Sequence, residues 1–533
     1  MFDTDRWPEY AALLAYLIAI LWIGIRSARE VRTSVDYTLA GRQIPWVVVL
    51  ATTAATMVGG GASVGSVANV YRFGIAAAFV TCAWGLQLIF TGLFLAPKLR
   101  SLNLITVGDY FELRFGELAR RLAVLNCLIF LIGAVVAQMV AIGSILEAVL
   151  ETNYYICGVI IGGAVVIFYS TIGGIRAVVK TDVLQFVILV GGLAVASAWL
   201  VIRQGGFEVI AEGIAEGIAG SSDPVTQNPN PFSLTSDRWP GIRVTTMFFA
   251  FFLGEMLVPP YAVRCFIARD SRGAKWGVAG SGIFLLLFHP IAIFALGVAA
   301  RGDDNIRTEI NTKFEEQHQK LVTAQTTSKT DKDHKDDKAL REKASQEAAR
   351  FTFPLLMRKA FPPMFAGVMI AALIAAVMSS ADSCLSSLAT VVMEDIYRPH
   401  IEPGASDKRL LTVARSTTLV AGIAATICAL IYRDIVEILE FIYDFWAPTM
   451  VVPFVVGILW YKPSRVYAVV ASMLGGMIAT IVWKFVLKSP YQFSPALFGF
   501  LIAVLAFFLF LPVTRHWRLA SMFRPRNPNP EHS

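Results

Sequence analysis

The stretch AAVMSSADSCLSSLAT, residues 375–390, decides how the rest of the chain is interpreted. It lies inside an apolar run, yet it carries a row of small hydroxyl side chains and one carboxylate, Asp382. At about 100° per residue on a helix, its small and polar residues share one arc of about 160°. This polar seam consists of Ala376, Ser379, Ser380, Asp382, Ser383, Ser386, Ser387 and Thr390. The stretch is therefore predicted to be a membrane helix with one polar face.

The carboxylate of Asp382 restricts what the polar seam can face. A charged side chain is costly in hydrocarbon, so we expect it to face the bundle interior, a water-filled path or a bound cation. Hydroxyl and peptide carbonyl oxygens can replace the hydration shell of an alkali cation. Small residues also let helices pack closely, which is an alternative use of the serines. The presence of Asp382 on the same face favours an ion site.

Composition excludes several classes of protein. Hydrophobic residues make up 56% of the 533 residues and charged residues only 16%, which excludes a soluble globular protein and predicts a polytopic membrane protein. The six cysteines lie singly without a CxxC pair, so neither a disulfide framework nor a zinc site is predicted. The net charge of +7 is spread over loops between apolar runs, so we expect a lipid bilayer and no nucleic acid as partner.

The apolar runs predict an all-α polytopic fold with about 13 transmembrane helices, two of them near residues 153–171 and 183–203. An odd number of spans puts the termini on opposite sides of the membrane. Basic residues favour an outer N-terminus and a cytoplasmic C-terminus in the cell membrane, since outer loops hold little beyond Arg72 and Arg433. The inner set is Arg26, Arg29, Arg32, Arg42, Lys98, Arg100, Arg114, Arg120, Arg121, Arg264, Arg269, Arg272, Lys275, Arg515, Arg518, Arg524 and Arg526.

Runs and loops together divide the chain into segments. These are an N-terminal helix with an inner loop at 1–44, a five-helix unit at 45–203, an outer loop at 204–240, a second five-helix unit at 241–461 that contains a hydrophilic outer insertion at 301–360, two C-terminal helices at 462–512, and a basic cytoplasmic tail at 513–533. Within the insertion, residues 301–350 carry eleven basic and eleven acidic side chains. Such a mixture favours a solvated insertion, part helical and part disordered, over a metal site.

Two of the predicted membrane helices contain residues that interrupt a helix. The first has Gly59, Gly60 and Gly61 at its middle, and each glycine weakens a helix by roughly 1 kcal/mol relative to alanine. The second carries Gly254 and the pair Pro259 and Pro260. Both lead a five-helix unit, and an odd number of spans inverts the second unit. An inverted 5+5 repeat with two discontinuous helices is typical of a secondary transporter with a binding site at mid-membrane depth.

Several motifs carry a family resemblance: AGRQIPW at 40–46, TVGDYFELRFG at 106–116, STIGGIRAVVKTDVLQ at 170–185, YAVRCFIARD at 261–270, and MSSADSCLSS at 378–387 followed by EDIYRP. On these the chain resembles the sodium:solute symporter family, which has the leucine-transporter-like fold. The resemblance covers residues 10–461 and is nearest to the choline-transporter-like branch and to uncharacterised bacterial branches. It implies sodium-coupled symport of a small organic solute into the cell by alternating access.

The resemblance also implies a set of sodium ligands. The first Na+ would be held by the carbonyls of Ala55, Val58 and Ala376 and by the hydroxyls of Ser379 and Ser380. Some family members bind another sodium ion through residues that match Ser379, Asp382, Ser383 and Asp182. Asp182 has an alternative role as a helix cap or as a salt-bridge partner of Lys180 or Arg176.

The family places its solute between the two broken helices and two neighbouring spans. The matching residues are Gly60, Gly61, Ala62, Trp84, Gln87, Glu255, Met256, Tyr261, Tyr443, Asp444 and Trp446. Aromatic faces there suit a quaternary ammonium group. Met57 stands where the choline branch has a tryptophan, and the sugar-type asparagine and histidine are replaced by Met57 and Ala62. Neutral and zwitterionic solutes therefore remain open.

The sequence leaves alternatives to sodium symport. Proton coupling through Asp382 or Asp182 is the alternative within the same fold. A transporter-like sensor usually adds a signalling domain, and the short tail at 513–533 argues against one. Channel function remains open, whereas an enzyme is not expected because no nucleotide-binding loop, nucleophile elbow or metal cluster is present. The oligomeric state is open, and a monomer would suffice.

Overall fold

The computed structural model describes residues 6–512 except 151–154, 211, 213–223, 227, 229, 237–238, 328–336, 433–434, 463–464 and 491–492. Its first helices are α1 (Trp7–Ala28), α2 (Ser34–Leu39), α3 (Trp46–Met57), α4 (Ser66–Phe73), α5 (Ile75–Phe90), α6 (Ala96–Ser101), α7 (Val107–Phe115), α8 (Glu117–Leu150) and α9 (Tyr155–Arg203). The later helices are α11 (Gly241–Gly254), α12 (Pro259–Ile267), α13 (Ser271–Gly302), α14 (Asp304–Thr327), α15 (Asp337–Ala349), α16 (Thr352–Ala360), α17 (Pro363–Val391), α18 (Arg398–His400), α19 (Asp407–Ile431), α20 (Ile435–Leu459), α21 (Val466–Ile481) and α22 (Pro495–Phe510). The predicted all-α fold is confirmed.

Among the described residues, nine helices are long and apolar enough to cross a membrane, or up to eleven if each bent pair counts as one span. The predicted number of 13 is not confirmed. The difference lies in two places. Helix α22 has 16 residues and is too short to be counted as a span. Helix α9 is a single 49-residue element that covers both the span predicted at 153–171 and the one predicted at 183–203.

Helix α9 is divided at Gly174, which has a left-handed φ of 53° and ψ of −157°. Before this residue, Tyr169 packs against Gly24 near the end of α1. After it, Gln185 donates a hydrogen bond of 3.0 Å to Tyr16 in the middle of α1. The chain therefore turns back along α1 at Gly174, where a side chain would strain the backbone and meet the ring of Tyr37.

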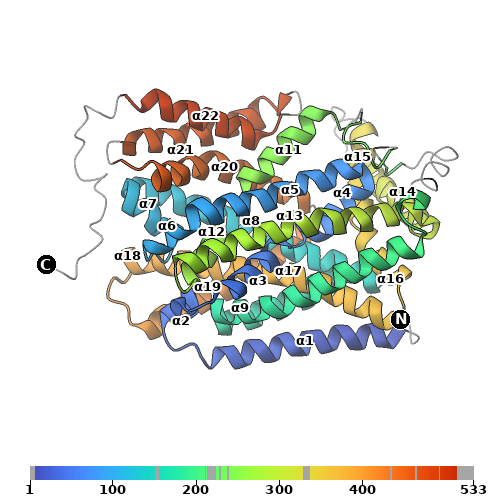
Figure 1. Ribbon diagram of the computed structural model, residues 1–533, viewed down its shortest axis with the longest axis horizontal. Coiled ribbons are helices and arrows are strands. Elements are labelled where there is room, and N and C mark those ends of the chain that lie inside the picture. Colours follow the sequence, from blue (N-terminus) through green and yellow to red (C-terminus); the bar gives the residue numbers. More distant parts are fainter. Residues whose placement is uncertain are drawn as a thin grey trace.

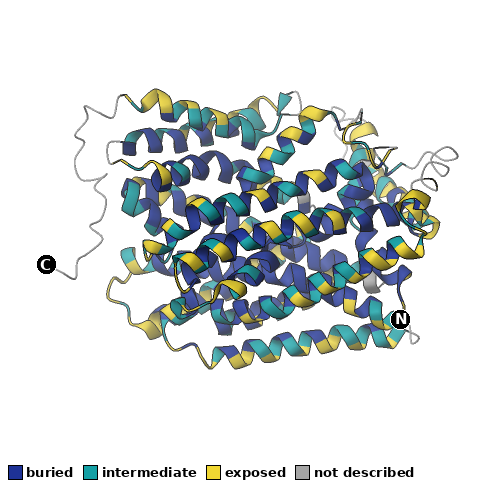
Figure 2. Cartoon of the chain, viewed as in Figure 1, coloured by how far each residue is buried: buried dark blue, intermediate teal, exposed yellow. Residues whose placement is uncertain are grey.

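The helices form one bundle in which α1 lies along one edge and α21 and α22 lie along the opposite edge (Figure 1). The bundle centre is formed by α8, α17 and α20, whose most apolar windows are 78%, 83% and 83% buried, against 22% for α1. The outer helices carry many exposed residues, coloured yellow in Figure 2, and these include large apolar ones. Examples are Ile18, Leu287, Ile291, Val420 and Leu509. Such an apolar exterior is suited to lipid and not to water.

Both interruptions expected from glycine and proline are present. Helix α3 ends at Met57, and the path from α3 into residues 61–73 bends by 64°. Helices α11 and α12 meet at 47°, and Leu257 between them has a left-handed φ of 55°. Pro259 and Pro260 then begin α12, where a proline costs no helical hydrogen bond. The two discontinuous helices are confirmed.

The described parts of the insertion at 301–360 are helical, in α14, α15 and α16, while its residues 328–336 lie outside the described residues. Arg72, expected in an outer loop, is instead buried in α4. Its guanidinium lies 2.5 Å from the Glu342 carboxylate and 3.2 Å from the Ser345 hydroxyl of α15. The insertion is therefore docked on the second half of the first broken helix.

Residues assigned to inner loops meet at another place in the fold. Arg42 donates hydrogen bonds to Asn103, and Arg100 donates to the carbonyl of Ala268. Arg176 of α9 lies beside Gly41 there and donates to the carbonyl of Glu30. Residues 44 and 268 form an isolated parallel bridge there. The basic tail at 513–533 and Arg433 lie outside the described residues.

Candidate functional site

The polar seam of α17 packs against the last turn of α3. The Ser379 hydroxyl donates to the carbonyls of Ala55 at 2.8 Å and Ala376 at 3.0 Å. The Ser380 hydroxyl donates to the carbonyl of Thr56 at 2.6 Å and lies 3.5 Å from that of Ala376. Five oxygen atoms from two helices thus converge in the protein interior. Each serine proton must rotate away from its carbonyl before these oxygens can face a cation.

Close approach of the two helices depends on the glycines. A Cβ on Gly59 would lie 2.4 Å from the Ser380 hydroxyl, and one on Gly60 would lie 2.5 Å from the Ala141 Cβ. The amide of Gly60 donates to the Gln138 side chain of α8 at 2.8 Å. The glycines therefore both interrupt the helix and allow α17 and α8 to approach its exposed end.

The structure brings four of the five predicted ligands of the first sodium ion together: Ala55, Ala376, Ser379 and Ser380. Val58 forms the C-cap of α3, with φ −85° and ψ 61°, so it lies at the break itself. Thr56 was not predicted, although its carbonyl accepts the Ser380 hydroxyl. Its position one residue after Ala55, in the turn before the glycines, is the sequence signal that was available.

Two of the predicted ligands of the second sodium ion, Asp182 and Ser383, contact a buried arginine. Arg264 of α12 was assigned to an inner loop, which is wrong, because its side chain is fully buried. Its guanidinium lies 2.9 Å from the Asp182 carboxylate and 2.5 Å from the Ser383 hydroxyl. It also donates to the Thr56 hydroxyl at 2.8 Å and to the carbonyl of Pro260 at 3.1 Å. Asp182 accepts a further hydrogen bond from Thr52.

Asp182 is neither a helix cap nor the salt-bridge partner of Lys180 or Arg176. It lies inside α9 and not at the start of that helix. Lys180 pairs with Glu30 at 2.6 Å, and Arg176 lies 3.6 Å from Asp36, so both basic neighbours have other carboxylates. Asp382 accepts hydrogen bonds from the Tyr169 hydroxyl at 2.8 Å and the Ser383 hydroxyl at 3.3 Å. Its carboxylate thus faces the bundle interior, as expected.

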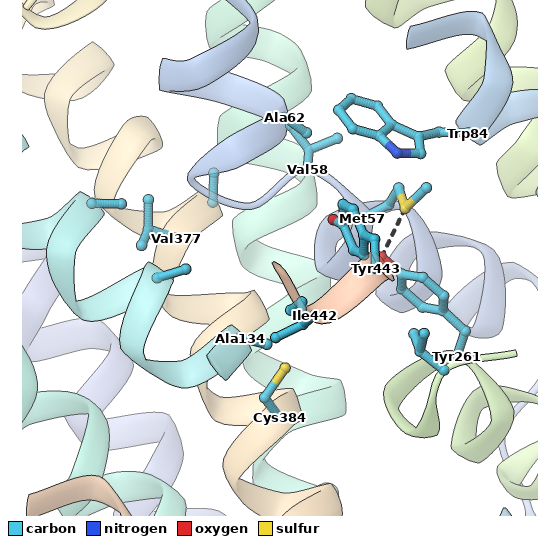
Figure 3. Packing of buried hydrophobic residues seen from close by; sticks show 14 of the residues in the cluster. Met57, Val58, Ala62, Trp84, Ala134, Tyr261, Val377, Cys384, Ile442 and Tyr443 are labelled. Atoms are coloured by element: carbon cyan, nitrogen blue, oxygen red, sulfur yellow. Dashed lines mark hydrogen bonds between the residues drawn. The ribbon is translucent and has the colours of Figure 1, made fainter. Parts of the chain in front are cut away.

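A cavity of about 80 Å³ adjoins the serine contact. Its walls come from both broken helices and from α5, α8, α17 and α20, and they include Thr56, Gly59 and Ser380. Six of the predicted solute residues line it: Gly61, Ala62, Trp84, Glu255, Tyr261 and Tyr443. Figure 3 shows several of these residues and the 2.7 Å contact between the Tyr261 hydroxyl and the Met57 sulfur. One serine therefore belongs to both the oxygen cluster and the cavity.

Five predicted solute residues do not line this cavity: Gly60, Gln87, Met256, Asp444 and Trp446. Asp444 instead lies 2.6 Å from the Lys484 ammonium and accepts from the amide of Ala496. The Trp446 indole donates to the carbonyl of Met256 at 2.9 Å, and Gln87 donates to the carbonyl of Glu255 at 3.3 Å. Trp446 and Gln87 thus bind backbone carbonyls at the break between α11 and α12.

The cavity has an aromatic wall that the sequence did not fully predict. Phe130 and Phe251 also line it, and Phe251 stacks on Trp84 with ring centroids 5.1 Å apart. Phe251 lies one helical turn before Glu255 on α11, which was the available signal. The Trp84 indole nitrogen is buried and has no hydrogen-bond partner among the described residues. The cavity thus offers aromatic faces and one unused donor.

Glu255 is the acidic group at the centre of this wall. Its carboxylate accepts hydrogen bonds from the Tyr261 hydroxyl at 2.9 Å and from the Tyr443 hydroxyl. Among the described residues, no basic side chain forms an ion pair with it. A buried carboxylate that is ionised needs a compensating positive charge.

Two discontinuous helices that meet a hydroxyl-bearing helix beside a central cavity define a secondary active transporter. The model of the sodium:solute symporter family matches residues 37–306 and 341–475. The chain belongs to this family, and it is a sodium-coupled symporter of a small organic solute, a multi-pass membrane protein and not an enzyme.

Curated relatives span nearly the whole chain. The sodium/glucose cotransporter of Vibrio parahaemolyticus is 26% identical over 95% of this chain and 88% of its own length. The high-affinity choline transporter 1 of Caenorhabditis elegans is 25% identical, covering 88% and 77%. The sodium/proline symporter of Escherichia coli is 25% identical, covering 90% and 88%. Among solved structures, a Na+-coupled sialic acid symporter in a substrate-bound outward-open state matches with a TM-score of 0.73 at 21% identity, covering 97% of this chain and 99% of the other. That last similarity supports the shared fold.

Proposed function

We propose that this symporter carries an amine-bearing organic solute, cationic or zwitterionic, with its positive group beside Glu255. The observation that carries the proposal is the buried Glu255 carboxylate, which the described residues leave without a basic partner. Trp84, Tyr261 and Tyr443 lie around it, and their ring faces attract a desolvated cation. Some of the relatives are named as transporters of choline or of the zwitterion proline, whereas others are named for glucose or myo-inositol.

In this proposal, one sodium ion binds where the Ala55, Val58 and Ala376 carbonyls face the Ser379 and Ser380 hydroxyls. The short oxygen contacts between α3 and α17 support it, because a dehydrated cation needs several neutral oxygens at close range. Rotation of the two serine protons would turn these hydrogen bonds into cation contacts. The ion would then hold the end of α3 against α17.

Ser380 gives a physical reason for coupling sodium to solute. Its hydroxyl belongs to the oxygen cluster and its side chain lines the cavity, together with Thr56 and Gly59. An ion that fixes α3 on α17 therefore also fixes one wall of the cavity. At a membrane potential of about −100 mV, one inward positive charge contributes roughly 2.3 kcal/mol to solute accumulation.

The proposed location is the plasma membrane, with the N-terminus outside and the C-terminus in the cytoplasm. It is supported by the inner-set residues Arg42 and Arg100, whose side chains lie at one place in the fold, where both contact Asn103. Labelling of single cysteines introduced at Arg29 and Glu347 of intact cells tests the orientation. Reaction of the Arg29 position with an impermeant reagent from outside would contradict it.

Thermal stability of the purified protein tests the solute class. The probes are choline, proline, glucose and myo-inositol, each with sodium and with N-methyl-D-glucamine in its place. We expect choline or proline to raise Tm only with sodium, and Glu255→Gln to remove that shift. A sodium-dependent shift with glucose that survives Glu255→Gln would refute the proposed class.

A matched pair of serine variants tests the sodium site. Ser380→Ala removes a hydroxyl that contacts α3, whereas Ser386→Ala removes one on the same helix whose hydroxyl has no hydrogen-bond partner among the described residues. We expect only Ser380→Ala to weaken the dependence of Tm on sodium. Equal sodium dependence in both variants would refute this site.

A further inference from the structure

Two of the residues that match a second sodium site, Asp182 and Ser383, already contact the side chain of Arg264. The Nη2 atom of Arg264 lies 2.9 Å from Asp182, 2.5 Å from the Ser383 hydroxyl and 2.8 Å from the Thr56 hydroxyl. These three oxygens come from α9, α17 and α3. A single positively charged nitrogen thus takes the position relative to them that a bound cation would take.

Charge and burial both disfavour a sodium ion beside this arginine. Arg264, Asp182 and Ser383 are each 0% exposed, so little solvent screens a second positive charge. The guanidinium carries a positive charge and already compensates the Asp182 carboxylate at 2.9 Å. Asp382 has its own partners in Tyr169 and Ser383. The residues present therefore do not fit a second sodium ion.

We propose that the guanidinium of Arg264 is a built-in substitute for a second sodium ion, so that each chain binds one sodium ion. This proposal rests on the proposed sodium site at Ser379 and Ser380. Because the arginine is covalently attached to α12, its charge stays with the protein through the transport cycle. It joins α12, the second half of one broken helix, to Thr56 near the end of α3, the first half of the other broken helix.

Equilibrium binding of radioactive sodium to the purified full-length chain tests the proposal without any solute. N-methyl-D-glucamine chloride keeps the ionic strength constant. We expect one sodium ion per wild-type chain, with a Hill coefficient near one. Two ions per wild-type chain would overturn the proposal, whatever the variants do.

Variants of the arginine test the substitution itself. Arg264→Gln removes the charge and leaves Asp182 unpaired, so a second sodium ion should bind and the number per chain should rise to two. Arg264→Lys keeps a positive charge and should stay at one. A folded Arg264→Gln chain that still binds one ion would overturn the proposal, because sodium would then be unable to replace the guanidinium.

Two further chains keep the test decisive. The double variant Arg264→Gln with Asp182→Asn removes both charges of the buried pair, and it should return to one sodium ion per chain. If Arg264→Gln does not fold, the wild-type number and the double variant decide, and two ions in either overturn the proposal. Ser380→Ala should lose the one remaining ion. Unchanged sodium binding in Ser380→Ala would contradict the sodium site of the proposed function. The role of Arg264 would then still be decided by the number of sodium ions bound per chain.

Discussion

Replacement of Gly59 by alanine should weaken sodium binding more than any other single added methyl group at the break. The new Cβ would lie 2.4 Å from the Ser380 hydroxyl and 2.9 Å from the Ser380 Cβ, whereas ordinary contacts begin at 3.4 Å. Helix α17 or the end of α3 must therefore move by about 1 Å, and such overpacking costs roughly 1–3 kcal/mol. Since about 1.4 kcal/mol corresponds to a factor of ten, we expect sodium affinity to fall by roughly fivefold to a hundredfold.

The assay is a sodium titration of thermal stability at constant ionic strength, repeated for Gly59→Ala and for Gly191→Ala. Gly191 is a matched control because it lies on an exposed face of α9 with nothing within 4 Å of an added Cβ. We expect its sodium midpoint to stay at the wild-type value. A folded Gly59→Ala chain with an unchanged midpoint would refute the placement of sodium between Ser380 and the glycine break.

Three further predictions follow from other parts of the structure. Glu255→Gln should abolish sodium-dependent uptake of the amine-bearing solute, whereas Tyr443→Phe, which removes one of its two hydroxyl partners, should weaken uptake several-fold; equal uptake by wild type and Glu255→Gln would count against a charge role. Arg72→Ala removes buried contacts to α15 and should lower stability by about 1–3 kcal/mol, detected as a lower Tm and faster proteolysis of the insertion, while exposed Arg341→Ala should leave Tm at the wild-type value. Uptake should follow the sodium gradient and not the pH gradient, and a proton-driven uptake that Asp382→Asn abolishes would establish the alternative ion.

Local features of the sequence predicted the interruptions well. Consecutive glycines at 59–61 and the proline pair at 259–260 disrupt helical hydrogen bonding wherever they occur, so their effect does not depend on distant residues. The contact of α3 with the polar seam could be inferred for a similar reason. The carbonyls left free at the end of α3 need hydrogen-bond donors, and the buried serine hydroxyls of α17 need acceptors. The two groups therefore pair with each other.

Long-range pairing was much harder to predict. Asp182 and Arg264 are 82 residues apart, and the sequence places Arg264 among basic residues that belong to a loop. Only the fold shows that α12, including Arg264, is buried along its whole length. Along α20, Tyr443 lines the cavity, whereas Asp444, one residue further, pairs with Lys484. Because adjacent helical residues point about 100° apart, a small error in helix orientation exchanges one for the other.

The shared position of Ser380 has a consequence for equilibrium binding. If sodium and solute each stabilise the same arrangement of one wall, their binding free energies are linked, and thermodynamic reciprocity applies. The factor by which bound sodium raises the affinity for the solute must equal the factor by which bound solute raises the affinity for sodium. Calorimetric titrations carried out in either order should therefore yield the same interaction energy.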